Sequence, residues 1–408
     1  MTTATPLAKW IRAQLQNRAS KRVTFAQFMA WTLYHPTLGY YTRPVTKIGR
    51  KGDFFTNSSV STVFGETLAP FLQKLSKTFA SDSWAILEVG GGDGKLASDL
   101  LRALPVRGTL PREGEQLAPD ALQGQKTFPP QRCAKPLQTY YMLEASPYHR
   151  ARVRERVGSD ARLHFIEKLD ELDAVDTFTR QEPVIVLANE LFDALPVHRL
   201  RYSDGKWQEI YVAWDGRTDA FTECLDDVSV SRLAQYVREE QPPERQGQTI
   251  EVNLEAERML QRLAAVIPRG YLLTIDYGDV SDTLWEPARR DGTLRCYYRH
   301  GAHDDPYVRV GEQDLTAHVN FTSLQRWGGA CGWETQLFAP QGEFLQQIGI
   351  LQQLVAHSDP NPFSAASKRN RAIRQLIAPG GMGSTFNVLL QARGNGAADV
   401  QAKTMSSM

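Results

Sequence analysis

The sequence predicts an α/β fold, with a mostly parallel sheet and helices on both of its faces. Short apolar runs alternate with helix-like stretches from Trp84 onward, and such alternation is typical of parallel sheets. The first run ends in a glycine-dense turn over 90–94, and a helix-like stretch follows over 95–104. A strand, a tight turn and a helix in this order form a nucleotide-binding corner in open α/β sheets.

The region before this corner is expected to be helical, with one long loop. Residues 7–33 predict two helices, and the second begins at a capping box, Thr24 to Gln27. Residues 34–58 are rich in proline, glycine and aromatic residues, and long loops in compact proteins are often functional. Apolar residues recur at helical spacing over 59–79.

The core is expected to contain five strands with helices between the early ones. The expected strands are 84–89, 138–143, 162–166, 183–188 and 270–275, and the helices are 95–104 and 147–157. Residues 105–136 interrupt this pattern with prolines, glycines and glutamines, so we expect an exposed insertion there. The fifth strand is expected to end in a structural turn, Asp276 to Gly278.

The remaining elements follow from local patterns. We expect two strands over 197–213, helices over 228–240 and 253–267, a turn-rich aromatic stretch over 278–320, a helix over 322–330, a strand over 333–338, helices over 341–357 and 364–377, and a last strand over 386–391. We divide the chain into N-terminal helices and a lid loop (1–80), a cofactor-binding core (81–200), inserted strands and helices (201–265), the completion of the core (266–392) and a flexible tail (393–408).

Composition disfavours several classes of partner and location. The 408 residues include 47 Lys and Arg against 46 Asp and Glu, so nucleic acid is an unlikely partner by charge alone. No apolar run approaches the ~20 residues of a membrane span. The four cysteines form no C-x-x-C pair and residues 1–10 contain no apolar signal segment, which predicts a cytoplasmic protein. His300 and His303 lack a third ligand, so no metal site is expected.

The glycine pattern indicates which kind of nucleotide binds. A dinucleotide loop needs a third glycine where this chain has Lys95, and no Lys-Ser/Thr pair of a phosphate-binding P-loop follows. The pattern is instead Glu-x-Gly-x-Gly-x-Gly, beginning at Glu88. Glycines let the backbone approach a ligand closely because they have no Cβ. The alternative is a strand–turn–helix corner that binds no ligand.

Polar side chains follow two further strands at the sheet edge where ligands bind. Glu144 ends the second strand and can accept hydrogen bonds from ribose hydroxyls; otherwise it is a solvated carboxylate. Asn189, Glu190 and Asp193 follow the fourth strand, although Asn189 alone would favour a helix cap. Paired carboxylates suit a cationic acceptor such as a guanidinium, which stays protonated in proteins.

These motifs, with others, resemble the MidA-type family of class I S-adenosylmethionine (SAM) methyltransferases. The resemblance lies in residues 33–41, 52–56, 64–66, 88–94, 188–197, 275–278, 292–300 and 311–321. The mitochondrial member of this family is a complex I assembly factor that methylates an arginine of a complex I subunit. Two departures are the long insertion at 105–136 and the Gly342-Glu343-Phe344 sequence.

The resemblance implies a Rossmann-like, mostly parallel sheet of seven strands, an N-terminal helical extension and an inserted substrate or partner region. It implies SAM as the methyl donor. The residues expected to bind the cofactor are Glu88, Gly90, Gly92, Asp93, Gly94, Glu144 and Asn189. The residues expected near the transferred methyl are Asn189, Glu190 and Asp193. The expected lid residues are Tyr40, Tyr41, Asp53, Phe54 and Thr56.

The expected function is therefore SAM-dependent methylation of an arginine side chain in a protein substrate, by in-line transfer that depends on positioning. Two alternatives remain open. One is an assembly or binding factor with a structural or vestigial SAM site. The other is a small-molecule methyltransferase. A homo-oligomer is also compatible with the sequence.

Overall fold

The computed structural model describes residues 5–45, 47, 56–105 and 135–394. Two of the expected lid residues, Asp53 and Phe54, lie outside these ranges. So do most of the expected insertion, at 106–134, and the tail from 395.

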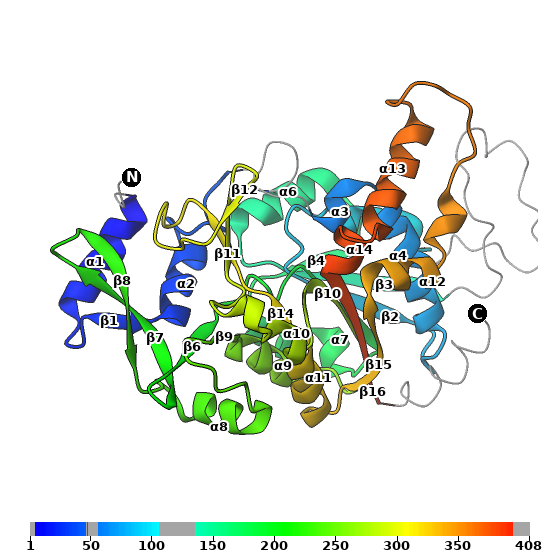
Figure 1. The fold of residues 1–408 in the computed structure, drawn as a ribbon. Helices are drawn as coiled ribbons and strands as arrows, with labels where there is room; N and C mark the ends of the chain where they lie inside the picture. The colour runs from blue at the N-terminus through cyan, green and yellow to red at the C-terminus, as the bar shows by residue number, and fades with distance from the viewer. Residues whose placement is uncertain (1–4, 46, 48–55, 106–134, 395–408) are drawn as a thin grey trace, which may run out of the picture.

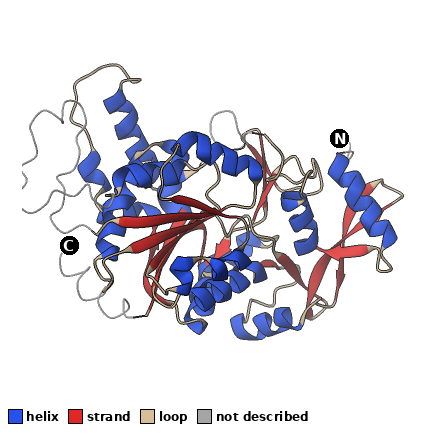
Figure 2. Ribbon diagram, turned by 180° about the vertical axis from the view of Figure 1, so that it is seen from behind, coloured by secondary structure: helices blue, strands red, loops and turns tan. Residues whose placement is uncertain are grey.

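A central sheet confirms the expected α/β class (Figures 1 and 2). In the described part of the chain its strand order is β15-β16-β10-β5-β2-β3-β4, and the short β14 pairs with β10. The strands are β2 (Trp84–Val89), β3 (Leu137–Leu143), β4 (Leu163–Ile166), β5 (Val184–Asn189), β10 (Gly270–Asp279), β14 (Val319–Asn320), β15 (Glu334–Pro340) and β16 (Phe386–Arg393). The pairs linking β10, β5, β2, β3 and β4 are parallel, and β16 runs antiparallel to β10 and β15.

Helices cover both faces of this sheet, as Figure 2 shows. Every residue of β2 is buried, and successive side chains face opposite sides, Ile86 into one apolar cluster and Leu87 into the other. The first cluster includes α4 (Val63–Ser76), α5 (Lys95–Ala103), α6 (Pro147–Val157), α12 (Gln341–Gln347) and α13 (Ala365–Ile377). The second includes α7 (Asp176–Thr179), α8 (Ser231–Glu240), α9 (Leu254–Val266), α10 (Ser281–Leu284) and α11 (Phe321–Ala330).

A second, antiparallel sheet joins the N-terminus to the middle of the chain, at the left of Figure 1. Its order is β1-β7-β6-β9, and β8 pairs with β7. The elements are α1 (Pro6–Asn17), β1 (Arg22–Thr24), α2 (Phe25–Tyr34), β6 (His198–Ser203), β7 (Lys206–Asp215), β8 (Ala220–Asp226) and β9 (Thr249–Val252). Thr24 caps α2, because its hydroxyl accepts a hydrogen bond from the Gln27 N–H at 3.1 Å. The sequence did not indicate β1, β8 or β9.

The turn-rich stretch contains a small sheet of order β12-β11-β13, formed by β11 (Arg295–Tyr298), β12 (Gly301–His303) and β13 (Asp314–Thr316). Leu315 and Cys296 of this sheet share an apolar cluster with Phe28 of α2. The small sheet is thereby packed against the N-terminal helices.

Short helices complete the chain: α3 (Asn57–Val60), η2 (Leu169–Ala174), η3 (Pro287–Arg289), η4 (Ile350–Gln353) and α14 (Met382–Thr385). The single helix expected over 341–357 is wrong. The α12 helix ends at Gln347, because Gly349 adopts a left-handed backbone conformation (φ +96°) that α-helices do not contain.

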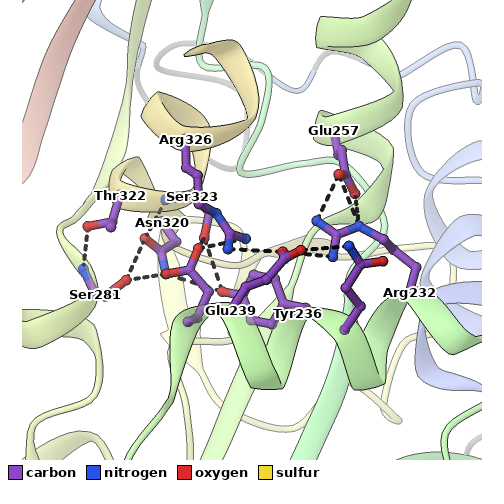
Figure 3. A network of polar contacts seen from close by, with 11 residues as sticks. Arg232, Tyr236, Glu239, Glu257, Ser281, Asn320, Thr322, Ser323 and Arg326 are labelled. Atoms are coloured by element: carbon purple, nitrogen blue, oxygen red, sulfur yellow. Dashed lines mark hydrogen bonds and ion pairs between the residues drawn. The ribbon is translucent and has the colours of Figure 1, made fainter. Parts of the chain in front are cut away.

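A polar network fixes α8 to the helices of the core (Figure 3). Arg232 of α8 pairs with Glu257 of α9 at 2.8 Å. Tyr236 of α8 is hydrogen-bonded to Ser323 of α11 at 3.1 Å, and Arg326 of α11 pairs with two glutamates of α8 at 2.9 and 3.0 Å. Because α8 connects β8 to β9, these contacts hold the second sheet against the core.

A Phe344→Ala variant tests the packing of the first cluster. Phe344 is 1% exposed and meets Phe71 edge to face at 5.2 Å, so its loss should lower the free energy of unfolding by about 3–5 kcal/mol. Urea denaturation measures the change. Phe363→Ala is the control, because Phe363 is 70% exposed and its loss should change stability by about 0.5 kcal/mol or less. Equal losses in the two variants would contradict the packing of Phe344 against Phe71.

Candidate functional site

A cavity of about 790 Å³ lies where β2, β3 and β5 end. The chain runs from β2 outward to β3 and β4, then crosses to β5 on the other side of β2, so the strand order reverses between β2 and β5. Ligands of open α/β sheets bind at such a point, in sites of roughly this volume. Ten of the predicted residues line the cavity: Tyr41, Thr56, Glu88, Gly90, Gly92, Asp93, Glu144, Asn189, Glu190 and Asp193.

Two predicted residues that the structure describes do not line it. Tyr40 is buried beside the ring of Tyr41. Gly94 precedes α5, and a Cβ there would lie 2.8 Å from the side chain of Val153 on α6. Gly94 thus allows α5 and α6 to pack closely, and the ammonium of the next residue, Lys95, pairs with Asp99.

The glycine loop forms one wall of the cavity. Gly90 and Gly92 have φ values of +73° and +55°, in the left-handed region that glycine adopts without strain. The Gly90 N–H donates to the carbonyl of Leu143 at 3.0 Å, which ties the loop to the end of β3. The Asp93 carboxylate pairs with Arg156 at 2.6 Å, which ties it to α6.

Two carboxylates lie beside this loop. The Tyr140 hydroxyl donates to Glu88 Oε2 at 2.8 Å, and burial raises the pKa of Glu88 to about 7. Glu144 Oε1 accepts a hydrogen bond from the Ser146 N–H at 2.8 Å, and Oε2 lies 3.6 Å from His149 Nδ1. The carboxylate of Glu144 is therefore held at the cavity wall, where the ribose was expected.

The donor set fits a nucleoside that carries an amino-acid group. Asn189 Oδ1 is buried and has no hydrogen-bond partner among the described residues, whereas its Nδ2 donates to Glu190 Oε1 at 3.2 Å. A buried acceptor in a polar cavity is a place for a donor from a ligand. The glycine loop offers backbone at close approach and Glu144 offers a carboxylate, so the residues present fit SAM.

Glu190 lies in a strained turn directly after β5. Its φ of +53° is unusual for a residue with a side chain, and such strain clusters at functional sites. Glu190 Oε1 also accepts a hydrogen bond from the Asn57 N–H at 2.8 Å. Burial raises the pKa of Glu190 to about 8, despite these hydrogen bonds.

The carboxylate of Asp276 stabilises the turn that follows β5. Its Oδ2 accepts hydrogen bonds from the N–H groups of Leu191 and Phe192 at 3.1 and 2.8 Å, and its Oδ1 accepts one from Tyr277 at 2.8 Å. The expected structural turn at Asp276 is wrong, because β10 continues to Asp279. Sequence reasoning missed this role, which depends on contacts between β10 and the residues after β5.

Part of the cavity lining is aromatic and acidic. This part includes four tyrosines and two aspartates: Tyr34, Tyr41, Tyr277, Tyr297, Asp193 and Asp314. Burial raises the pKa of Asp193 well above its usual range, and repulsion from Asp276 and Asp314 adds to the effect. Tyr34, Tyr297 and Asp314 were not singled out from the sequence, although all three lie in segments that carry the family resemblance.

The histidines do not form a metal centre in the part of the chain that the structure describes. His300 lines the cavity and His303 does not. Within the same ranges, no three histidine, cysteine or acidic side chains gather in an arrangement that could hold a metal ion.

Comparisons with known proteins agree with this geometry. Residues 63–339 match the sequence model of a family described as "Putative S-adenosyl-L-methionine-dependent methyltransferase". The chain is 30% identical to a Drosophila melanogaster protein named "Protein arginine methyltransferase NDUFAF7 homolog, mitochondrial", over 94% of this chain and 84% of that protein. It is 24% identical to the human protein arginine methyltransferase NDUFAF7, mitochondrial, over 94% and 82%.

A solved structure is similar over nearly the whole fold. It is a "likely methyl transferase from Burkholderia thailandensis bound to S-adenosyl-homocysteine", with 29% identity and a TM-score of 0.79 over 97% of this chain and 95% of that one. A second, native structure of a protein from the same organism has 28% identity and a TM-score of 0.75, over 96% and 94%.

One prediction fails against these findings. The curated relatives are named as mitochondrial proteins, which contradicts the cytoplasmic location predicted from the cysteines and the N-terminus. In the described ranges, none of the helices combines the length and apolar character that crossing a membrane requires.

Proposed function

Because this chain belongs to the MidA-type family of SAM-dependent methyltransferases, we propose that it methylates an arginine side chain of a protein substrate. The observation that carries the proposal is the pair of carboxylates, the half-buried Glu190 and the buried Asp193, at the cavity that the glycine loop lines. Buried carboxylates are stabilised by a cation, and a guanidinium is the side-chain cation that never deprotonates in proteins. The relatives named protein arginine methyltransferases support the same acceptor.

We assign one set of cavity residues to the cofactor and another set to the acceptor side chain. Bound SAM supplies an electrophilic methyl group on a sulfonium. Glu88, the backbone of Gly90 and Gly92, Glu144 and Asn189 would hold it, and Tyr41 and Thr56 would cover the site.

Glu190 and Asp193 would hold the guanidinium charge and aim one nitrogen at the methyl group. Positioning of this kind supplies much of the catalysis in a displacement reaction. The attacking nitrogen must release a proton, and the Glu190 carboxylate can accept it. Its pKa of about 8 makes it a stronger base than an ordinary glutamate.

The first experiment supplies methyl-labelled SAM to the purified protein with a mitochondrial extract, followed by hydrolysis of the labelled protein to amino acids. Label in methylarginine is the expected result. Label in another residue, or in a small molecule, would overturn the arginine assignment. SAM binding without any transfer would favour an assembly factor with a vestigial site.

A Glu190→Gln variant should lose about 10²- to 10⁴-fold in kcat, as expected when a catalytic acid or base is removed. The glutamine side chain can still accept the hydrogen bond from the Asn57 N–H, so the loss of kcat reports the removal of the carboxylate charge. In the wild type, kcat/KM should rise with pH and level off above about 8, because the carboxylate form binds the cation. In Glu190→Gln, kcat/KM should not rise with pH in this range. A variant whose kcat/KM rises as it does in the wild type would contradict the role of Glu190.

The raised pKa of Glu190 also makes stability depend on pH. Activity should rise with pH, whereas the free energy of unfolding should fall. Between pH 4.5 and about 8, the cofactor-free native state holds a proton on Glu190 that the unfolded chain has released. The free energy of unfolding should therefore fall as pH rises through this window, and Glu190→Gln should weaken the dependence.

We also propose the domain division stated from the sequence. The core at 81–200 and 266–392 would bind the cofactor, and the segments at 1–80 and 201–265 would contribute to substrate binding. The pairing of β1 with β7 supports a joint role for these two segments.

A further inference from the structure

The α13 helix reaches the cavity with its last turn. Gln375 of this turn lines the cavity together with Met382 of α14, the next helix along the chain. From there α13 projects from the core, toward the upper right of Figure 1. Its inner face is anchored, because Ala372, Ile373 and Leu376 are buried. Gln375 lines the cavity and is also exposed, so it lies at the cavity mouth.

A row of basic side chains lies on the exposed face of α13. Lys368, Arg371 and Gln375 are three and four residues apart, the spacing that places side chains on one face of a helix. All three are exposed, and so is Arg374. At about 1.5 Å of rise per residue, Arg371 and Lys368 lie roughly 6 and 10 Å along the helix from Gln375. The positive charge therefore begins about one helical turn from the cavity mouth.

The fold does not neutralise these cations. Among the described residues, Lys368, Arg371 and Arg374 form no ion pair, whereas Arg369, on the inner side of the helix, pairs with Glu66 at 2.7 Å. The local sequence accounts for this difference. Residues 344–392 contain four basic side chains and a single acidic one, in a chain that is balanced at 47 against 46. The outer face of α13 is thus a local concentration of positive charge.

The cavity has the opposite character. Among the described residues that line it, seven are acidic, one is a lysine (Lys47) and none is an arginine. A ligand that fits both surfaces has a cation at its centre, which enters the cavity, and anionic groups beside it, which meet α13. A polypeptide segment with acidic residues near an arginine has this arrangement of charge.

We propose that the exposed face of α13 binds acidic residues of the substrate polypeptide that lie close to the acceptor arginine in its sequence. This inference rests on the proposed function. A polypeptide whose arginine side chain enters the cavity has its backbone at the mouth, which Gln375 borders. An extended chain advances about 3.3 Å per residue, so the row from Gln375 to Lys368 matches about three residues. Arginine clusters recognise acidic motifs in other peptide-binding sites through charge-assisted hydrogen bonds.

The test compares two peptides that share a central arginine and differ only at the flanking positions, which are glutamate in one and glutamine in the other. Calorimetry on the protein saturated with S-adenosyl-homocysteine measures binding without turnover. We expect the wild type to bind the glutamate peptide about 3- to 30-fold more tightly, as two or three exposed ion pairs would produce. The preference should shrink as the salt concentration rises, because salt screens exposed charges.

The variant Lys368→Gln/Arg371→Gln/Arg374→Gln removes the three cations together. It should bind the two peptides with affinities within about twofold of each other, because only the charges that distinguish them are gone. Its affinity for S-adenosyl-homocysteine should stay within about twofold of the wild type, because none of the three side chains lines the cavity. This second measurement shows that the variant is folded.

The matched control is Lys9→Gln/Arg102→Gln/Arg238→Gln. It removes the same charge from three exposed positions that do not line the cavity, so it should keep the wild-type preference for the glutamate peptide. A charge reversal, Lys368→Glu/Arg371→Glu, adds a gain of function. It should bind a peptide with lysine at the flanking positions more tightly than the glutamate peptide.

Equal binding of the glutamate and glutamine peptides by the wild type, including no measurable binding of either, would overturn the inference. So would a preference that the triple variant of α13 retains. Binding to phosphatidylglycerol vesicles but not to phosphatidylcholine vesicles, without a preference between the peptides, would assign this face to a membrane surface instead. Failure of the proposed function is separate: the glutamate peptide would bind preferentially, but its arginine would receive no methyl group.

Discussion

A Gly92→Val variant is expected to bind SAM at least about 100-fold more weakly than the wild type, because valine is a genuine outlier at positive φ. Gly92 has a φ of +55° and lines the cavity, so valine would both strain the loop and place a branched side chain beside the cofactor. Calorimetric titration with SAM measures the effect. The far-ultraviolet circular dichroism spectrum should stay unchanged, since the core strands do not depend on this residue.

Gly216→Val is the matched control for this variant. Gly216 lies between β7 and β8, its φ is not positive, and a Cβ there meets no atom within 4 Å. SAM affinity should be unchanged. If Gly92→Val binds SAM as tightly as Gly216→Val does, the glycine loop is not the cofactor site.

Asp276→Ala is expected to have the second large effect, and to affect stability and activity together. The change leaves three N–H groups, those of Leu191, Phe192 and Tyr277, without an acceptor. Each unsatisfied buried group costs about 1–3 kcal/mol, so the total loss should exceed about 3 kcal/mol. Because two of these groups belong to the turn that carries Glu190 and Asp193, kcat should fall as well.

Urea denaturation and the methyl-transfer assay measure these two effects. Asp176→Ala is a suitable control, because Asp176 is exposed and its carboxylate pairs with the equally exposed Arg180 one turn later. It should change stability by about 0.5 kcal/mol or less. An Asp276→Ala protein with unchanged stability and kcat would show that the turn holds its shape without this carboxylate.

The sequence predicted the central sheet well because its strands are continuous apolar runs bounded by turn residues. All six residues of β2 are buried, and a short apolar run of this kind is typical of a strand covered on both faces. The strands it missed are short or depend on distant partners: β1 has three residues, and it pairs with β7. A three-residue segment carries too little pattern to identify a strand.

The same distinction applies to the candidate site. The glycine loop and Asn189, Glu190 and Asp193 were predicted because each directly follows a recognisable strand. Asp276 and Asp314 were not, because their roles arise only from folding. Asp314, for example, is hydrogen-bonded to Tyr41, 273 residues earlier in the chain.

The pairing of β1 with β7 also sets the order in which this protein can fold during synthesis. Arg22 pairs with Ala213, so the N-terminal segment emerges from the ribosome long before its partner exists. Until then Phe25 and Phe28, which are fully buried in the finished protein, lack the part of their apolar cluster that Val212 and Phe221 supply. Contacts this distant in sequence form slowly, and exposed apolar surface during the delay invites aggregation. The part of the cavity that contains Tyr41 is thus completed only after distant residues such as Asp314 have been synthesised.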